Sequence, residues 1–205
     1  MAKKRDGSLL MNKKAIIIFV KKPEVGKVKT RLASSIGDER ALGIYKKLLE
    51  HTEDVVDKVS ADTHVFYANG IVGDDLWNGH HKHLQPEGNL GEKMKFAFQK
   101  MFSLGYSSVV IIGSDCAELT SDIMQAGFEF LQEKEVVIGP CLDGGYYFLG
   151  MNNFYPDLME EIPWSTSTVF SDTVAKMNDR SFAILPKLSD IDYEEDLERS
   201  PWLWD

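Results

Sequence analysis

The chain has 205 residues, of which 43% are hydrophobic and 27% are charged, and its formal net charge is −9 at pH 7. This composition is typical of a globular protein long enough to bury a core, and it excludes a disordered or collagen-like chain. The negative charge argues against a general nucleic-acid binder, and two cysteines are too few for a disulfide scaffold.

The predicted elements alternate between strands and helices. Short β-branched or apolar runs indicate buried strands, and apolar residues that recur every three or four positions indicate helices. In chain order we predict a strand at 15–20, a helix at 38–59, a strand at 63–68, a helix at 90–104, a strand at 108–113, a helix at 120–131, strands at 135–139 and 145–150, a helix at 165–177, a strand at 182–185 and an acidic helical turn at 193–199. The polar segment 77–83 fits neither pattern, and we interpret His80, His81 and His83 as part of a surface loop.

This order of elements predicts an α/β protein with an open sheet. About five residues separate the strands at 135–139 and 145–150, which is too few for a helical crossover between parallel strands. We therefore expect a mixed sheet. The chain shows no internal repeat or clear linker, so we predict a single domain over residues 13–205, preceded by a flexible basic extension at residues 1–12.

A basic loop follows the first predicted strand. Residues 1–31 carry a net charge of +8 and the rest of the chain −17, and half of the early basic residues lie between positions 21 and 31. In open α/β sheets ligands bind beyond the carboxyl ends of the strands, and cations with free backbone N–H groups bind phosphates. The loop matches neither a P-loop nor G-x-G-x-x-G. We predict that Lys21, Gly26, Lys29 and Arg31 hold a phosphorylated ligand, the alternative being a solvated basic loop.

Two aspartates follow later strands. Asp115 comes directly after the strand at 108–113, where a carboxylate suits a divalent cation, although Ser114 and Asp115 could simply cap the next helix. Asp143 precedes Gly144 and Gly145 in a predicted tight reversal. It could be a second metal ligand, could position an acceptor hydroxyl, or could serve only the turn. The two glycines leave room for a sugar against the backbone.

Three further features have two interpretations each. The loop at residues 85–94 could close over a base or sugar, or could be a loop that caps a helix. Trp164 could stack on a sugar ring, or could pack behind a Ser/Thr helix cap. Cys116 and Cys141 both follow strands, but neither has a companion histidine at a recognisable spacing, which disfavours a catalytic thiol.

Six ordered segments resemble a known family. They are KKPEVGKVKTRL (21–32), QPEGNLGEKM (85–94), GSDCAEL (113–119), GPCLDGGYYFLG (139–150), IPWST (162–166) and SDIDYEEDL (189–197). Together they resemble the nucleotide-diphospho-sugar transferase superfamily, which has the GT-A fold, and most closely its small bacterial glycosyltransferase-like branch associated with arsenosugar biosynthesis. The chain departs from the family pattern at Asn89 and Ala117, and the D-x-D motif of many GT-A enzymes is reduced to Ser114 and Asp115.

The resemblance implies a Rossmann-like, mixed, mainly parallel sheet with helices on both faces. It implies a nucleotide bound by residues of the first loop and the 85–94 loop: Lys21, Pro23, Gly26, Lys29, Arg31 and Gly91. It also implies a divalent metal, Mg²⁺ or Mn²⁺, at Asp115. We predict that Asp115 and Asp143 act in catalysis, with Asp143 assisting the metal or positioning the acceptor. The expected substrate contacts are Gly144, Gly145 and Trp164.

The function implied is that of a metal-dependent glycosyltransferase moving a sugar from a nucleotide-diphospho-sugar to a small acceptor. Residues 29–32 (KTRL) also resemble the guanylyltransferases that activate phospholactate in deazaflavin-cofactor synthesis, so nucleotidyl transfer from a nucleoside triphosphate to a phosphorylated small molecule is the alternative. A third hypothesis is a non-catalytic nucleotide-binding protein on the same scaffold.

The apolar runs are too short for a membrane span, which needs about 18 residues, and the start of the chain does not fit a signal peptide. We therefore expect a cytoplasmic protein. From the net negative charge we expect that it binds no nucleic acid. The hydrophobic residues at the C-terminus could pack on the domain or on a partner chain, so a homo-oligomer is one expectation.

Overall fold

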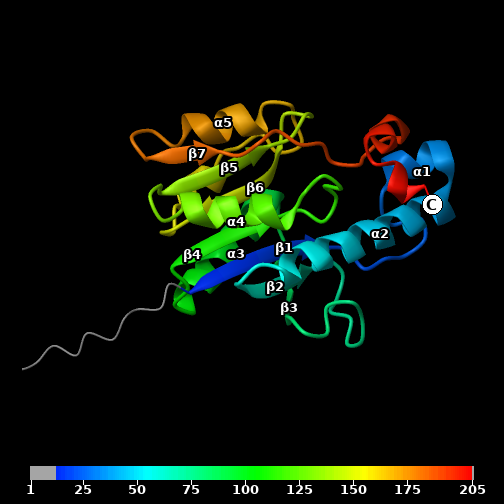
Figure 1. Cartoon of the computed structure of the whole chain (residues 1–205), viewed down its shortest axis with the longest axis horizontal. Helices are drawn as coiled ribbons and strands as arrows, with labels where there is room; N and C mark the ends of the chain where they lie inside the picture. Colours follow the sequence, from blue (N-terminus) through cyan, green and yellow to red (C-terminus); the bar gives the residue numbers. More distant parts are fainter. Residues whose placement is uncertain (1–12, 205) are drawn as a thin grey trace, which may run out of the picture.

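The computed structural model describes residues 13–204, so the predicted extension at residues 1–12 lies outside the described residues. The centre of the fold is a seven-stranded sheet in the order β3-β2-β1-β4-β6-β5-β7 (Figure 1). The strands are β1 Lys14–Val20, β2 Asp62–Tyr67, β3 His81–Leu84, β4 Ser108–Ile112, β5 Val136–Pro140, β6 Tyr146–Met151 and β7 Phe182–Ile184. The helices are α1 Thr30–Ile36, α2 Asp38–Asp57, α3 Leu90–Ser103, α4 Ser121–Phe130 and α5 Val169–Ala175, with 3-10 helices η1 Pro156–Met159, η2 Glu194–Arg199 and η3 Pro201–Leu203.

The sheet is mixed, which confirms the prediction. β6 runs antiparallel to both β4 and β5, and every other neighbouring pair is parallel. Strands β1, β4 and β5 therefore point the same way. Their carboxyl ends lie at one edge of the sheet, which brings together the segments that follow them.

Helices cover both faces of the sheet, as predicted. Ile16 and Ile18 of β1 belong to a core cluster shared with α2 and α4, whereas Ala15 and Ile17 belong to a second cluster shared with α3 and α5. This alternation follows from the two-residue period of a strand. Complete burial of one isoleucine side chain stabilises the fold by about 1.5–3 kcal/mol, so a β-branched central strand anchors both layers.

A third core cluster joins the C-terminal segment to the region after β1. Leu197 and Leu203 pack with Leu32 of α1 and with the first half of α2, and Figure 1 shows η2 and η3 beside α1. Trp202 also packs against the ring of His51 at 5.3 Å between centroids. The last residues described therefore pack on their own domain, and they hold segment 189–199 against the start of α1. None of the described helices has the length and apolar character that crossing a membrane requires.

Three local predictions were wrong. Helix α1 begins directly after Lys29, where a longer loop was expected. His81 and His83 lie in an edge strand rather than in a surface loop; β3 is polar because it borders only one neighbouring strand. The helix predicted from residue 165 begins at Val169, because Ser165 has a φ of 66°, outside the right-handed helical region.

A chain of five polar side chains joins β2, β3 and α3. Lys100 Nζ lies 3.0 Å from His83 Nδ1, His83 Nε2 lies 2.9 Å from His64 Nδ1, and His64 Nε2 lies 3.0 Å from the Tyr106 hydroxyl. Tyr106 then donates to Asp62 at 2.7 Å. A lysine ammonium only donates and a carboxylate only accepts, so the ends of the chain fix its direction. Both histidines must be neutral, with the proton on Nε2.

This chain predicts acid-sensitive stability. Burial, followed by the nearby His81 and His83, lowers the pKa of His64 to about 4 from about 6.5. Its contribution is complete above pH 6.5 and is lost as the pH falls towards 4, because only the unfolded chain takes up the proton readily. Between pH 7 and pH 5 we expect the free energy of unfolding, measured in urea, to fall by about 2 kcal/mol more in wild type than in His64→Gln. An equal fall in the two proteins would contradict this prediction.

Candidate functional site

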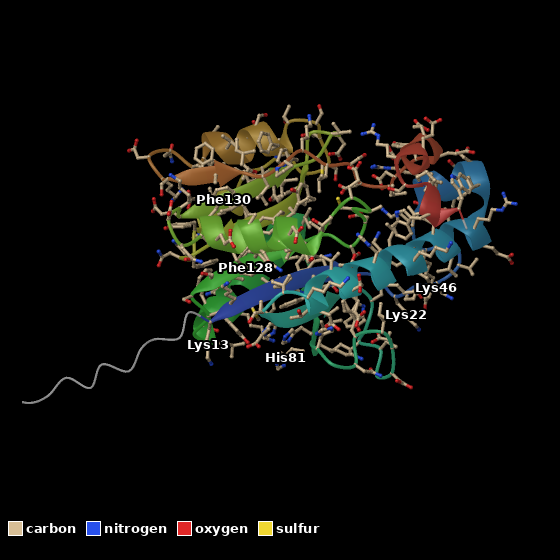
Figure 2. The ribbon with its side chains drawn as sticks, in the orientation of Figure 1. Lys13, Lys22, Lys46, His81, Phe128 and Phe130 are labelled. Carbon is tan, nitrogen blue, oxygen red and sulfur yellow. The ribbon has the colours of Figure 1, made fainter. Side chains whose placement is uncertain are left out.

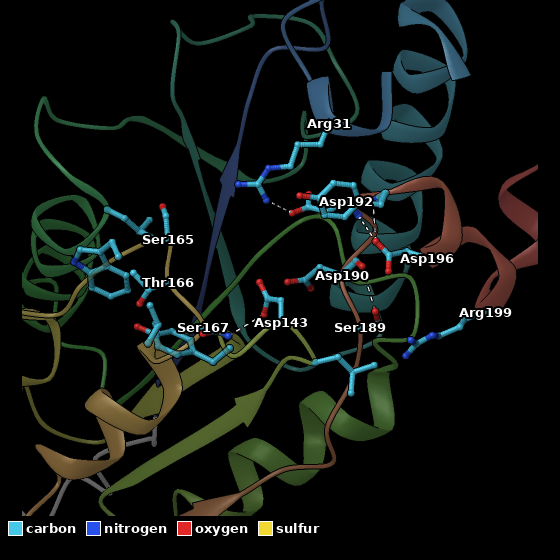
Figure 3. Close-up of a pocket in the computed structure, with 17 residues that line it drawn as sticks. Arg31, Asp143, Ser165, Thr166, Ser167, Ser189, Asp190, Asp192, Asp196 and Arg199 are labelled. Atoms are coloured by element: carbon cyan, nitrogen blue, oxygen red, sulfur yellow. Dashed lines mark hydrogen bonds and ion pairs between the residues drawn. The ribbon is translucent and has the colours of Figure 1, made fainter. Parts of the chain in front are cut away.

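A cavity of about 590 Å³ opens at the carboxyl edge of the sheet. Residues from the start of α1, from the β5–β6 turn, from the turn before α5 and from segment 189–199 converge on it (Figure 3). Asp143 and Asp190 lie at its centre, and Arg31, Trp164 and Arg199 also line it. Two residues predicted at separate motifs, Arg31 and Asp143, therefore line one cavity.

Lys29 links the basic loop to the strand-end aspartate. Its Nζ lies 3.0 Å from Asp115 Oδ2 and 3.4 Å from Asp192 Oδ1, and Arg31 donates to Asp192 Oδ2 at 2.9 Å. Only 7% of the Lys29 side chain is exposed. Burial alone would lower the pKa of Lys29, but the charges of Asp115 and Asp192 more than offset this and leave it raised. The site thus holds a permanent cation against Asp115.

Asp190 supplies a carboxylate oxygen without a partner. The Cys141 thiol donates to its Oδ2 at 3.1 Å, but its Oδ1 is buried and accepts no hydrogen bond from the described residues. Burial, followed by the charge of Asp115, raises the pKa of Asp190, and burial likewise raises the pKa of the Cys141 thiol, which stays protonated. One ligand atom each from Cys141, Asp143 and Asp190 lies within 4.8 Å of the others. An orphaned buried oxygen amid surplus negative charge suits a hard divalent cation.

An aromatic and hydroxyl wall faces these acids. Trp164 and Tyr146 meet edge to face at 6.3 Å between ring centroids, and Ser165, Thr166 and Ser167 follow in the turn before α5. Gly144 has a φ of 92°, and a Cβ there would lie 2.0 Å from the Ser167 carbonyl oxygen. Only glycine permits this approach of the β5–β6 turn to the wall.

The turn itself is held by Asp143, whose Oδ1 accepts a hydrogen bond from the Gly145 N–H at 2.8 Å. The turn interpretation of this segment is therefore correct locally. Asp143 is exposed and lines the cavity with Gly145, so the same carboxylate is also available to a ligand.

Gly91 is buried at the start of α3, behind the aromatic wall. A Cβ there would lie 2.4 Å from the Met159 carbonyl oxygen and 2.6 Å from Trp164 Nε1. The helix begins at a capping box in which Asn89 accepts from the Glu92 N–H and Glu92 accepts from the Asn89 N–H. Gly91 therefore lets the helix end pack against Trp164. Its predicted contact with a nucleotide has no counterpart in the cavity lining.

Lys21 and Pro23 line a different cavity, of about 340 Å³, between the loop after β1, α2 and the segment after β2. Lys22 and Lys46 line it too and lie near each other in Figure 2. Gly26, with a φ of 73°, turns the loop between the two cavities. The residues predicted to bind one nucleotide are thus divided between the two sides of the first loop.

Asp190, Asp192 and Arg199 received no role from sequence patterns. They lie more than seventy residues after Asp115 and follow no buried strand of recognisable length. The only signal was segment 189–197, which belonged to the family resemblance without an assigned function. Packing of segment 189–199 on α1 brings these side chains to the site.

Comparison with known proteins identifies the family. The profile of a family described as an uncharacterised protein conserved in bacteria (DUF2064) matches residues 51–166. A crystal structure from Desulfovibrio desulfuricans G20, provisionally named a nucleotide-diphospho-sugar transferase, is 35% identical with a TM-score of 0.83. The match covers 89% of this chain and 84% of that chain. The search of curated proteins finds no match.

Two more distant structures share the fold. Rv0371c from Mycobacterium tuberculosis H37Rv, solved in complex with manganese, is 10% identical with a TM-score of 0.57, and the match covers 92% of this chain and 97% of that chain. CMP:2-keto-3-deoxy-manno-octonic acid synthetase, solved with CTP, is 9% identical with a TM-score of 0.59. That match covers 94% of this chain and 98% of the synthetase chain. At these identities the likeness shows the fold alone. The predicted mixed α/β sheet of the nucleotide-diphospho-sugar transferase type is confirmed.

Proposed function

The chain belongs to the DUF2064 family. We propose that it is a metal-dependent glycosyltransferase, which moves a sugar from a nucleotide-diphospho-sugar to a small acceptor. The supporting observation is the unpartnered, buried Oδ1 of Asp190 in a cavity at the carboxyl edge of the sheet, near the Lys29–Asp115 ion pair. The 35% identical structure with the same provisional activity also supports it.

The basic loop would bind the nucleotide. Lys29 and Arg31 are fixed beside the cavity by their carboxylate partners, and both are suited to binding the diphosphate. Lys21, Pro23 and Gly26 are proposed to contact the rest of the nucleotide from the other side of the loop. Gly91 would contribute indirectly, since it fits the end of α3 against Trp164.

Asp143 and Asp190 would hold Mg²⁺ or Mn²⁺, because one ligand atom of each lies within 4.8 Å of the other and the Asp190 Oδ1 lacks a partner. Asp115 would complete the site, since its charge already acts on Asp190. The bound cation would neutralise charge on the departing diphosphate. The manganese complex of Rv0371c, which shares the fold, is consistent with this choice of metals.

The other cavity residues would orient the reactants. Trp164 and Tyr146 would stack on the sugar ring, and Gly145 would let it lie against the backbone. Gly144 would contribute by bringing the β5–β6 turn close to Ser167. Asp143, exposed at the centre, would accept a hydrogen bond from the acceptor hydroxyl. The hydroxyl oxygen bonds to the anomeric carbon, the sugar–phosphate bond breaks, and the nucleoside diphosphate leaves with its electron pair while the hydroxyl proton passes to solvent.

Nucleotidyl transfer is a second candidate. It is supported by the fold shared with a synthetase solved with CTP and by the KTRL segment that contains Lys29 and Arg31. In that reaction the acceptor attacks the α-phosphate of a nucleoside triphosphate and pyrophosphate leaves. The same cations would stabilise the leaving group.

Thermal shift with nucleotides, sugar nucleotides and nucleoside triphosphates, each with and without Mn²⁺, tests the proposal. A ligand at about 100 times its Kd stabilises the fold by about 2.7 kcal/mol, which is several degrees in Tm. We expect a sugar nucleotide to give this shift with Mn²⁺, and Asp115→Ala to abolish the metal dependence and turnover. Pyrophosphate release from a triphosphate would favour nucleotidyl transfer.

A shift that survives Asp115→Ala, with no turnover by the wild type, would instead favour the non-catalytic hypothesis. If no nucleotide raised the Tm of the wild type, the proposed function would be wrong.

A further inference from the structure

Arg199 is a cation that the neighbouring carboxylates leave unpaired. It is exposed and lines the cavity together with Asp192 and Asp196. Asp192 is occupied by Lys29 and Arg31, and Asp196 Oδ2 accepts the backbone N–H groups of residues 192 and 193 at 2.9 and 2.8 Å. Within residues 13–204 the Arg199 guanidinium has no carboxylate within ion-pair distance.

The cavity has three sides around its acidic centre. Figure 3 shows Arg31 on one side of Asp143 and Asp190, the turn at residues 165–167 on a second and Arg199 on a third. The first side carries the cations proposed for the diphosphate, and the second carries the wall proposed for the sugar. The side with Arg199 is therefore left for the acceptor.

The lining next to Asp143 in the chain is partly apolar. Leu142 lines the cavity, and 46% of its surface is exposed, a large fraction for a leucine beside a polar site. Ser189 lies near it and also lines the cavity. A ligand reaching from Asp143 to Arg199 would place a negative group at the guanidinium, which binds carboxylates and phosphates in a bidentate manner, and Leu142 offers an apolar surface in the same cavity.

We propose that the acceptor is a small hydroxyl-bearing anion, a carboxylate or a phosphate, whose negative group binds Arg199. This inference rests on the proposed function, and it names the acceptor class of the same site. Four aspartates line the cavity and would repel such an anion, so a dedicated unpaired cation is what its binding requires. An uncharged acceptor would leave Arg199 without a partner.

Ligand-observed NMR with the full-length chain and Mg²⁺ tests this with three probes of similar size. They are 3-hydroxypropanoate, 2-hydroxyethyl phosphate and uncharged propane-1,3-diol. We expect the anionic probes to bind at least about tenfold more tightly than the diol. Arg199→Ala should remove this preference, Arg199→Lys should retain part of it, and Arg40→Ala, an exposed arginine on α2, should leave it unchanged.

The two anionic probes distinguish the source of the charge, because the tighter one identifies a carboxylate or a phosphate acceptor. Equal binding of the diol and the anions, or an anion preference that survives Arg199→Ala, would overturn the inference. Thermal shift with sugar nucleotides on the same variants separates the two proposals. Arg199→Ala should keep the shift, so a protein that binds sugar nucleotides without anion preference refutes the acceptor class alone. A protein that binds no nucleotide refutes the proposed function.

Discussion

Asp190→Asn is expected to raise stability and abolish transfer. In the absence of a divalent cation the variant should melt several degrees above wild type, because it removes a buried carboxylate whose Oδ1 has no partner and whose nearest charges include Asp115 and Asp143. The same change removes a proposed metal ligand, so transfer should fall at least about 100-fold. Asparagine can still accept the hydrogen bond that Cys141 donates to the carboxylate.

The stability gain of Asp190→Asn should depend on pH, because the pKa of Asp190 differs between the folded and the unfolded wild type. Burial and Asp115 raise the pKa of Asp190 in the folded protein, so the unfolded chain releases that proton more readily as the pH rises above about 4. Wild type therefore loses stability relative to Asp190→Asn between pH 4 and pH 8, and the gap in Tm should widen over that range. Calorimetry of both proteins measures it.

Added Mn²⁺ should reverse the order, since the cation stabilises only the protein that retains the ligand. Asp179→Asn, which removes an exposed carboxylate outside the cavity lining, is the matched control and should behave as wild type in every measurement. A variant that melts below wild type and is still stabilised by Mn²⁺ would contradict the assignment of Asp190 to the metal site.

The sheet was predictable where strands are buried on both faces. β1 and β4 are apolar after their first residue, and β5 is apolar throughout, because neighbouring strands and helices cover both sides. The short β5–β6 connection already required an antiparallel pair. β3 was missed because an edge strand keeps polar side chains. His81 and His83 serve a hydrogen-bond chain and ring packing against His64, and no local pattern indicates such partners.

The site was predictable only where it follows strand ends. The carboxyl-edge rule placed the basic loop near Asp115, and the structure joins Lys29 to it at 3.0 Å. Asp190 follows no long strand, and its position depends on packing of η2 against α1, which is a tertiary effect. Lys21 was predicted with Lys29, but a motif read along the chain does not show which side of a loop each residue faces.

Lys29→Met is expected to destabilise the fold and weaken nucleotide binding. The Lys29 side chain is 7% exposed and holds Asp115 and Asp192, whose side chains are 37% and 36% exposed. Loss of one partner from a fully buried pair costs about 3–5 kcal/mol, and solvent around the two carboxylates should reduce this to about 2 kcal/mol. Nucleotide affinity should fall at least about tenfold, because the cation proposed for the diphosphate is gone.

Two comparisons separate this effect from general damage to the loop. Lys27→Met removes an exposed lysine whose ion-pair partner among residues 13–204 is Glu24, and it should leave both Tm and nucleotide affinity unchanged. In the double variant Lys29→Met/Asp115→Asn the stability loss should be smaller than the sum of the single losses, because Asp115 is the carboxylate that Lys29→Met leaves uncompensated, whereas Asp192 keeps Arg31. Nucleotide affinity should stay low in the double variant, since no cation is restored. Additive stability losses would mean that Lys29 stabilises the fold through its packing and not through its ion pair with Asp115.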